Sequence, residues 1–181
     1  MKGTQAAEPD VRPSDAFAAL YDEHFPRIYQ YIASRLGRDV ADDITADTFL
    51  IALRKQDRFD AERGAVRPWL FGIATKLVAQ HRRQEMRRYR ALAKLGPEEV
   101  AESHENQVIN WVRAESLQRG LAQALGALSR GERDVLLLSA VSELSNEEVA
   151  QALGIAYGTV GSRLSRARRK VRSVMREDDH G

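Results

Sequence analysis

The 181-residue sequence contains no cysteine. The absence of thiols excludes disulfide scaffolds, thiolate zinc sites and cysteine nucleophiles. Histidine is also scarce, and its four copies lack the spacing of metal ligands: His24, His81, His104 and His180. We therefore expect a protein with no metal site and no cofactor.

Long apolar runs are absent as well. No segment approaches the roughly 20 apolar residues that cross a bilayer, and the polar residues 1–13 lack the apolar core of a signal peptide. No segment alternates apolar and polar residues over a useful length, as a half-buried strand would. The sequence predicts a cytoplasmic, all-α protein without membrane insertion.

Neither sign of charge dominates the whole chain. Lysine and arginine number 28, aspartate and glutamate 26, and the formal net charge is only +2. The basic residues are instead concentrated in a few segments. Such localised basic patches indicate directed docking, as on nucleic acid, rather than bulk adsorption.

An acidic segment with few apolar residues divides the chain. Glu98, Glu99, Glu102 and Glu105 have no lysine or arginine among them, and such a segment cannot bury much surface. We expect two small helical domains joined by this acidic linker. The expected boundaries are a disordered tail over 1–13, a front domain over 14–93, the linker over 94–110, a back domain over 111–176 and a second tail over 177–181.

Periodic apolar residues predict three helices in the front domain. Ser14 can cap the first helix, Pro26 predicts a break or kink inside it, and Gly37 can end it. Asp39 can cap the second helix. Pro68 suits the first turn of the third, which is long.

The back domain carries the pattern of a helix-turn-helix. Two Ser/Glu pairs have capping-box spacing, Ser129 with Glu132 and Ser145 with Glu148. Gly154 can adopt the positive φ that the turn needs. The second helix carries a basic cluster, and no acidic residue occurs between positions 156 and 176. Such a cluster is commonly a solvated surface, but the missing acidic neighbours and the helix-turn-helix favour nucleic-acid contact.

Two faces of the front domain allow more than one interpretation. Asp43, Asp47 and Leu50 share a helical face that is either solvated or a docking site for a basic partner, and the residues alone favour the solvated interpretation. The third helix carries a basic ridge of Lys76, Gln80, Arg83 and Arg87. Nearby aromatic residues could stack on single-stranded bases: we expect Trp69 and Phe71 to be core, and Phe59 to be the better candidate.

Four motifs in order resemble one family, the extracytoplasmic-function sigma factors of bacterial RNA polymerase, within the primary sigma family. They are ADDITADTFL (41–50), similar to its polymerase-binding helix; RPWLFGIATKL (67–77), similar to its promoter-melting helix; and LSRGERDVLLL (128–138) with GTVGSRLSRARR (158–169), similar to its second DNA-binding domain. The resemblance implies a dissociable specificity subunit that is not an enzyme.

The resemblance also implies roles for particular residues. Binding of core polymerase is implied for Asp42, Asp43, Asp47 and Leu50. Recognition and melting of the minus-ten element is implied for Gln56, Asp57, Arg58, Phe59, Asp60, Lys76, Gln80, Arg83 and Arg87. Recognition of the minus-thirty-five element is implied for Tyr157, Gly158, Thr159, Ser162, Arg163, Arg166 and Lys170.

The implied partners are core RNA polymerase, through its β and β′ subunits, promoter DNA and an anti-sigma factor. The acidic linker would lie along the polymerase channel that later carries RNA. Gly161 stands where many family members carry lysine, and Ala156 where a capping serine is common, so we expect base recognition by Arg163 and Arg166 instead.

Two other functional classes compete with this interpretation. A stand-alone helix-turn-helix regulator would bind duplex DNA tightly without polymerase. An enzyme acting on nucleic acid could use Asp42, Asp43 and Asp47 as metal ligands. These carboxylates occupy one helix with no supporting histidine or Gly-rich phosphate loop, which disfavours the enzyme.

Overall fold

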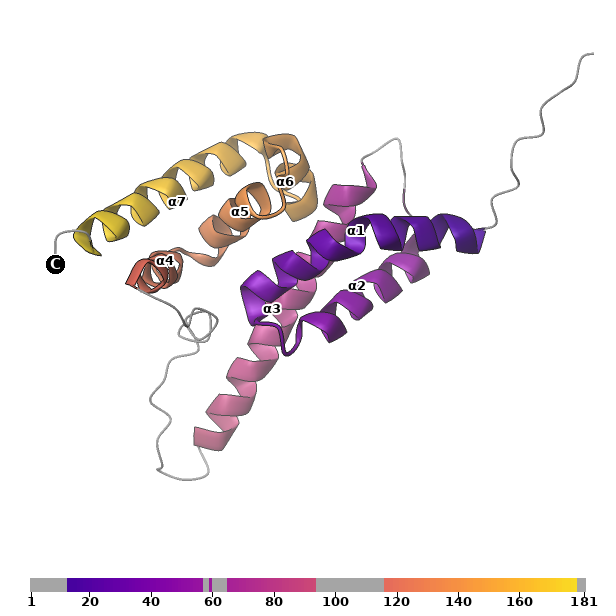
Figure 1. The fold of residues 1–181 in the computed structure, drawn as a ribbon, viewed down its shortest axis with the longest axis horizontal. Coiled ribbons are helices and arrows are strands. Elements are labelled where there is room, and N and C mark those ends of the chain that lie inside the picture. Colours follow the sequence, from indigo (N-terminus) through magenta and orange to yellow (C-terminus); the bar gives the residue numbers. More distant parts are fainter. Residues whose placement is uncertain (1–12, 57–58, 60–64, 94–115, 179–181) are drawn as a thin grey trace, which may run out of the picture.

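The computed structural model describes residues 13–56, 59, 65–93 and 116–178, and all regular structure within them is helical (Figure 1). The expected all-α class is therefore confirmed. The helices are α1 (Pro13–Leu36), α2 (Ala41–Lys55), α3 (Val66–Ala93), α4 (Ser116–Gly126), α5 (Arg130–Ala140), α6 (Asn146–Leu153) and α7 (Tyr157–Asp178).

Several expectations concern residues outside this part of the chain. They are the tail before residue 13, the linker over 94–110, the start of the back domain at 111–115, and the loop residues Asp57, Arg58 and Asp60. At the other end, α7 continues to Asp178 and so includes two residues that were expected to belong to a tail.

Helices α1, α2 and α3 pack together as the front half. Of the two effects expected near Pro26, a break or a kink, the break is absent, because α1 continues through the proline. Apolar residues on both sides of the proline hold the helix: Phe25 lies 6.3 Å from Phe49 between ring centroids, and Ile28 is fully buried. The ribbon of α1 changes direction part-way along, as a kinked helix does (Figure 1).

Backbone groups, and not capping side chains, stabilise the turn between α1 and α2. Gly37 ends α1 at a φ of 88°, and its N–H donates to the carbonyl of Ala33 at 2.9 Å. Asp39 is not the cap of α2, contrary to expectation. The N-cap is Val40, which makes no side-chain capping bond, so the acidic first turn of α2 favours its N-terminus through charge alone.

Helices α4 to α7 form the back half, and their caps follow the sequence closely. Both expected capping boxes are present, Ser129 with Glu132 and Ser145 with Glu148. Gly154 adopts a left-handed φ of 63° in the turn between α6 and α7. The sequence predicts these features because each depends only on residues three or four positions apart.

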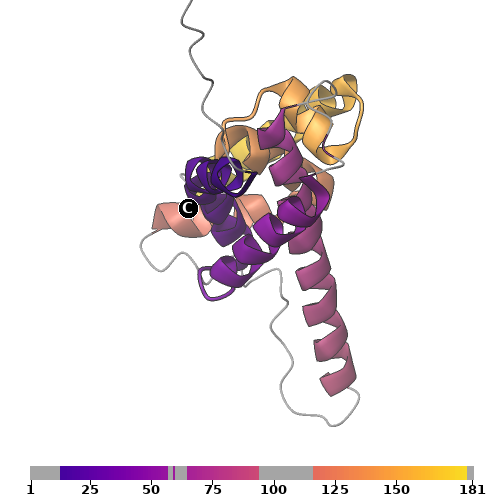
Figure 2. The ribbon, with the colours of Figure 1, turned by 90° about the vertical axis from the view of Figure 1, so that its right-hand side faces the viewer.

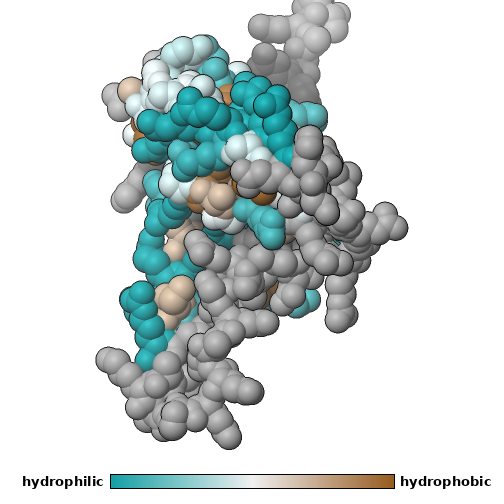
Figure 3. Space-filling view, turned by 90° about the vertical axis from the view of Figure 1, so that its left-hand side faces the viewer, coloured by the Kyte–Doolittle hydropathy of each residue, from teal (hydrophilic) through white to brown (hydrophobic). Residues whose placement is uncertain are grey.

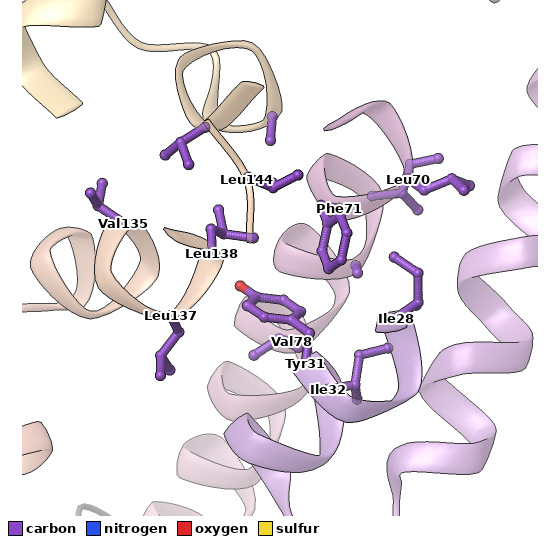
Figure 4. Close-up of a cluster of buried hydrophobic side chains, with 14 of the residues drawn as sticks. Ile28, Tyr31, Ile32, Leu70, Phe71, Val78, Val135, Leu137, Leu138 and Leu144 are labelled. Carbon is purple, nitrogen blue, oxygen red and sulfur yellow. The ribbon is translucent and has the colours of Figure 1, made fainter. Parts of the chain in front are cut away.

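The two halves share one hydrophobic core. Tyr31 and Phe71 of the front half lie near Leu138 and Leu144 of the back half, and all four side chains are buried (Figure 4). Helices α3 and α6 form a principal contact between the halves. The C-terminal part of α3 instead extends away from the other helices (Figure 2).

Candidate nucleic-acid interface

Helix α7 buries one side and exposes the opposite one. Its apolar stripe, which includes Val160, Leu164 and Ala167, is buried against the back half. The side opposite this stripe is exposed and carries, besides Tyr157, small or basic residues: Gly158, Gly161, Ser162, Ser165, Arg168, Arg169 and Arg172. Seen from the side on which α7 lies, most of the described surface is hydrophilic (Figure 3).

Two of the predicted DNA contacts on α7 are paired with a carboxylate of α5. Lys170 Nζ lies 2.8 Å from Glu132 Oε2, and Arg166 Nε lies 3.5 Å from Glu132 Oε1. The premise that this basic cluster has no acidic partner is therefore wrong. The partner lies 38 residues away in sequence from Lys170, where inspection of the helix alone could not find it.

Glu132 is well suited to hold these cations. Its side chain is nearly buried and accepts a hydrogen bond from the Ser129 backbone N–H at 2.9 Å. The hydrogen bond from Lys170, followed by that from Ser129, lowers the pKa of Glu132 to about 2. The carboxylate is thus charged at neutral pH, and it joins the N-terminus of α5 to the middle of α7.

Arg163 lies against the backbone of α5. A Cβ built on Gly131 would lie 3.0 Å from Arg163 Nη1, so the glycine allows the guanidinium its close approach. Arg163 also lines a groove of about 420 Å³ between the halves, together with Lys76 of α3 and Asp134 of α5. The expected base-recognising arginine therefore borders the front half in this arrangement.

The remaining predicted contacts of α7 lie at its N-terminus. Tyr157, Gly158 and Ser162 are exposed, and Thr159 is half-buried. The Ser162 hydroxyl donates to the Thr159 carbonyl at 3.1 Å. These residues occupy the end of the second helix of a helix-turn-helix, which is the end that reaches base edges in a major groove.

The basic ridge on α3 exists as expected. Lys76, Gln80, Arg83 and Arg87 are all exposed, while Ala74 and Val78 on the other side of the helix are buried. The last turns of the ridge lie on the extended end of α3 (Figure 2). A row of basic and polar side chains on an exposed helix face can follow a phosphate backbone.

Arg82 is adjacent to this ridge but has a different role. Its Nη2 donates to the carbonyl of Arg35, in the last turn of α1, at 2.7 Å. Burial, followed by the charges of Arg35 and Arg133, lowers the pKa of Arg82 to about 10. Arg82 stays protonated at neutral pH and ties α3 to α1.

Two aromatic rings meet at the start of α3. The centroids of Phe59 and Trp69 are 4.8 Å apart, and both residues are half-buried. The Phe59 N–H donates to the carbonyl of Gln56, an exposed residue, at 3.0 Å. Phe71 is core, as expected, whereas Trp69 supports Phe59 near the surface.

The acidic face of α2 is accessible. Asp42, Asp43 and Asp47 are exposed, and Leu50 is 43% exposed. Leu53, which no sequence motif indicated, is 41% exposed one turn further on. An exposed leucine pair beside carboxylates is a feature of partner-binding surfaces.

The comparisons with known proteins identify the family. Sigma-70 region 2 matches residues 20–88, and Sigma-70 region 4 matches residues 118–171. The chain is 33% identical over 179 residues to the ECF RNA polymerase sigma factor SigL of Mycobacterium tuberculosis, covering 98% of this chain and 96% of SigL. The chain belongs to the extracytoplasmic-function sigma factors.

Other relatives agree with this membership. The sigma factor is 31% identical to SigW of Bacillus subtilis, over 90% of both chains. It is also 31% identical to BldN of Streptomyces coelicolor, but it spans only 62% of the length of BldN. Because these relatives are extracytoplasmic-function factors, the chain is assigned to this narrower family and not to the primary sigma family.

Two solved sigma factor structures have a similar fold. CnrH in complex with the cytosolic domain of CnrY matches with a TM-score of 0.66 and 26% identity, covering 91% of this chain and 90% of that one. RpoE of Bartonella quintana in complex with the anti-sigma factor NepR matches with a TM-score of 0.68 and 27% identity, covering 89% and 97%.

Two further properties concern only the part of the sigma factor that the structure describes. None of its helices is both long enough and apolar enough to cross a membrane. In the same residues, histidine, aspartate and glutamate side chains do not gather into a group that could hold a metal ion.

Proposed function

We propose that this sigma factor is a dissociable subunit that binds core RNA polymerase, directs promoter-specific initiation and has no catalytic chemistry of its own. The observation that carries the proposal is the presence of three separate exposed surfaces on one small chain. They are the acidic face of α2, the basic ridge of α3 and the outer side of α7. Each has the charge and shape for a different contact.

The acidic face of α2 would bind polymerase. Asp43 and Asp47 give it negative charge, and Leu50 with Leu53 gives it an apolar centre. Charged rims around exposed leucines provide orientation and affinity together in protein interfaces. This proposal reverses the solvated interpretation of the same face and assigns it to the clamp helices of the polymerase.

Helix α3 and the residues just before it would bind the opened minus-ten strand. Lys76, Gln80, Arg83 and Arg87 would follow the phosphates and bases. We assign recognition of a base flipped from the strand to residues 56–60, among which Phe59 can stack on the base. Stacking on an aromatic side chain contributes about 1–3 kcal/mol per base, which offsets a substantial part of the cost of unstacking.

The N-terminal half of α7 would enter the major groove at the minus-thirty-five element. Tyr157, Gly158 and Ser162 lie at its exposed end, while Arg163, Arg166 and Lys170 lie toward α5 and Thr159 is half-buried. Arg166 and Lys170 are paired with Glu132, so each would contact a phosphate while still bound to this carboxylate. Arg168, Arg169 and Arg172 on the outer side are the freer phosphate contacts.

The domain boundaries belong to this proposal as well. The front domain over 14–93 and the back domain over 111–176 enclose the two regions that match the family. The linker over 94–110 would lie in the polymerase channel that later carries RNA. The two similar solved structures contain CnrY and NepR, the latter an anti-sigma factor, which supports an anti-sigma factor as a further partner.

Transcription in vitro tests this function. Purified sigma factor, core RNA polymerase and genomic fragments should give defined transcripts that share an upstream motif, and core polymerase alone should give none. Nanomolar, sequence-specific binding to duplex DNA without polymerase would instead identify a stand-alone regulator. A variant carrying Phe59→Ala should retain polymerase binding and lose promoter opening, which permanganate reactivity of unpaired thymines measures.

A further inference from the structure

We propose that Glu132 is a positioning residue for minus-thirty-five recognition: it restrains Arg166 and Lys170 from following the phosphates of non-cognate DNA and so sets the discrimination between promoter and other sequences. This inference rests on the proposed role of α7 in promoter binding. It assigns a function to a residue of α5 that is not itself expected to contact DNA.

Three basic residues of α7 face the first turn of α5. Arg163, Arg166 and Lys170 are spaced by three and four positions, so they share one side of the helix. A Cβ built on Gly131 would lie 3.0 Å from Arg163 Nη1, and Arg166 and Lys170 both pair with Glu132. The first turn of α5 therefore lies against three of the side chains expected to contact the minus-thirty-five element.

Glu132 cannot follow its partners into solvent. Its side chain is 7% exposed, whereas those of Arg166 and Lys170 are 51% and 44% exposed. The carboxylate also accepts a hydrogen bond of 2.9 Å from the Ser129 backbone N–H in the capping box. A phosphate that takes over either cation completely must therefore draw it away from a carboxylate that stays in place.

The shared carboxylate also reduces the charge that the pair presents to DNA. The two positive charges of Arg166 and Lys170 and the one negative charge of Glu132 leave a net charge of +1. Non-specific binding depends on the number of phosphates that cations neutralise, irrespective of sequence. Together, the two restrained side chains should therefore count as about one cation on non-cognate DNA.

The restraint affects cognate binding less. A cation held in one place meets a phosphate only when α7 is seated in the groove at the depth and angle that bring the phosphate to it. Base contacts on a cognate site provide that seating, whereas on other sequences the side chains would have to reach out individually. Holding Arg166 and Lys170 therefore disfavours the wrong sequence more than the right one, which raises specificity.

Arg166 can recognise a base while it is restrained. It approaches Glu132 through Nε, at 3.5 Å. A guanidinium has five N–H groups, and bidentate recognition of guanine uses two of them. One nitrogen held by a carboxylate therefore leaves enough donors for a base and fixes where the guanidinium lies.

Glu132→Gln tests the proposal with a matched control. Glutamine removes the charge but keeps the size of the side chain and an acceptor for the capping box, in which both residue types serve at this position. Glu147→Gln removes the same charge from an exposed position in the first turn of α6. In the described part of the chain Glu147 forms no ion pair. Circular dichroism checks that each full-length variant is folded.

The first measurement uses the full-length protein alone with mixed-sequence duplex DNA, between about 50 and 200 mM salt. Glu132→Gln should steepen the salt slope of binding by about one and raise affinity on the order of tenfold at about 0.1 M salt. Glu147→Gln should leave the slope unchanged. Adding Lys170→Ala to Glu132→Gln should return the slope to the wild-type value, because the site again carries one net positive charge.

The second measurement uses the holoenzyme with a promoter found by transcription and with the same promoter after its minus-thirty-five element is scrambled. Glu132→Gln should lower the ratio of the two affinities by about three- to tenfold, because only the scrambled site gains the full effect of the released cations. A purely structural role of Glu132 would lower stability without steepening the salt slope.

A second set of variants keeps Glu132 and does not depend on how Glu132→Gln folds. Arg169→Ala with Arg172→Ala removes two exposed cations from the outer side of α7 and should reduce the salt slope on mixed-sequence DNA by about two. Arg166→Ala with Lys170→Ala should reduce it by only about one. Equal reductions would show that the carboxylate restrains neither cation.

The remaining contrary outcomes are also distinct. Equal salt slopes for Glu132→Gln and Glu147→Gln would overturn the restraint. A steeper slope with an unchanged affinity ratio would overturn the role in discrimination. An absence of promoter-dependent transcription by the wild type with core polymerase would refute the sigma factor function itself, while the salt slopes of the protein alone would still decide whether Glu132 restrains the two cations.

Discussion

Lys170 on α7 donates a hydrogen bond of 2.8 Å to Glu132, a residue that also caps α5. The pair connects the recognition helix to the helix that supports it. A side chain expected to contact DNA therefore also holds the helix-turn-helix together. Because Lys170 serves both the fold and the expected DNA contact, a variant of α7 has to be tested for stability as well as for DNA binding.

Glu132→Gln should lower the stability of the back half at neutral pH. The pKa of Glu132 falls from 4.5 to about 2 on folding, so its contribution is complete above about pH 4.5 and is lost as the pH falls toward 2. We expect a melting temperature lower by about 2–6 °C at pH 7. Thermal unfolding followed by circular dichroism should show that variant and wild type converge near pH 2.

Lys170→Ala and Arg172→Ala should have different effects. Arg172 is exposed on the outer side of α7, so its loss should leave the melting temperature unchanged and reduce the salt slope of promoter binding by about one. Lys170→Ala should lower the melting temperature, since Glu132 then loses its main partner. Equal salt slopes for Arg172→Ala and wild type would remove Arg172 from the DNA contacts.

Asp134→Asn should destabilise the whole chain by about 3–5 kcal/mol, because it leaves the buried Arg35 without its charged partner. Replacing both residues, by Arg35→Met with Asp134→Leu, should recover much of this loss. Urea unfolding of the single and double variants gives the coupling energy. Additive losses would show that the two side chains act independently.

Asp43→Arg with Asp47→Arg should abolish binding to core polymerase without unfolding the protein. Both residues are exposed on α2, away from the buried Phe49 and Ala52. Co-purification with polymerase measures the effect, and circular dichroism confirms the fold. Asp22→Arg, a charge reversal on the exposed side of α1, is the matched control and should bind normally. Retained binding by the double variant would remove this face from the polymerase interface.

Local features of the fold follow directly from the sequence. The two capping boxes and the left-handed Gly154 depend on residues three or four apart, so spacing identifies them. The buried side of α7, with Val160 and Leu164, also follows from helical periodicity. At Pro26 the sequence allows a break or a kink, and apolar packing on both sides of the proline keeps α1 continuous.

The partners of individual side chains do not follow from the sequence. Glu132 pairs with Arg166 and Lys170, and Arg35 with Asp134, through approaches set by the packing of distant helices. The close approach of Gly72 to Ala152 does not follow either, because Ala152 lies 80 positions later in the chain. Periodicity identifies which face of a helix is buried, but not what covers it.

The shared core has a consequence for association with other chains. Tyr31, Phe71, Leu138 and Leu144 are fully or almost fully buried where the halves meet (Figure 4), so separation would expose an apolar patch on each half. Such patches attract other chains as readily as the intended partner. The shared core therefore keeps these apolar side chains from other chains for as long as the two halves stay packed.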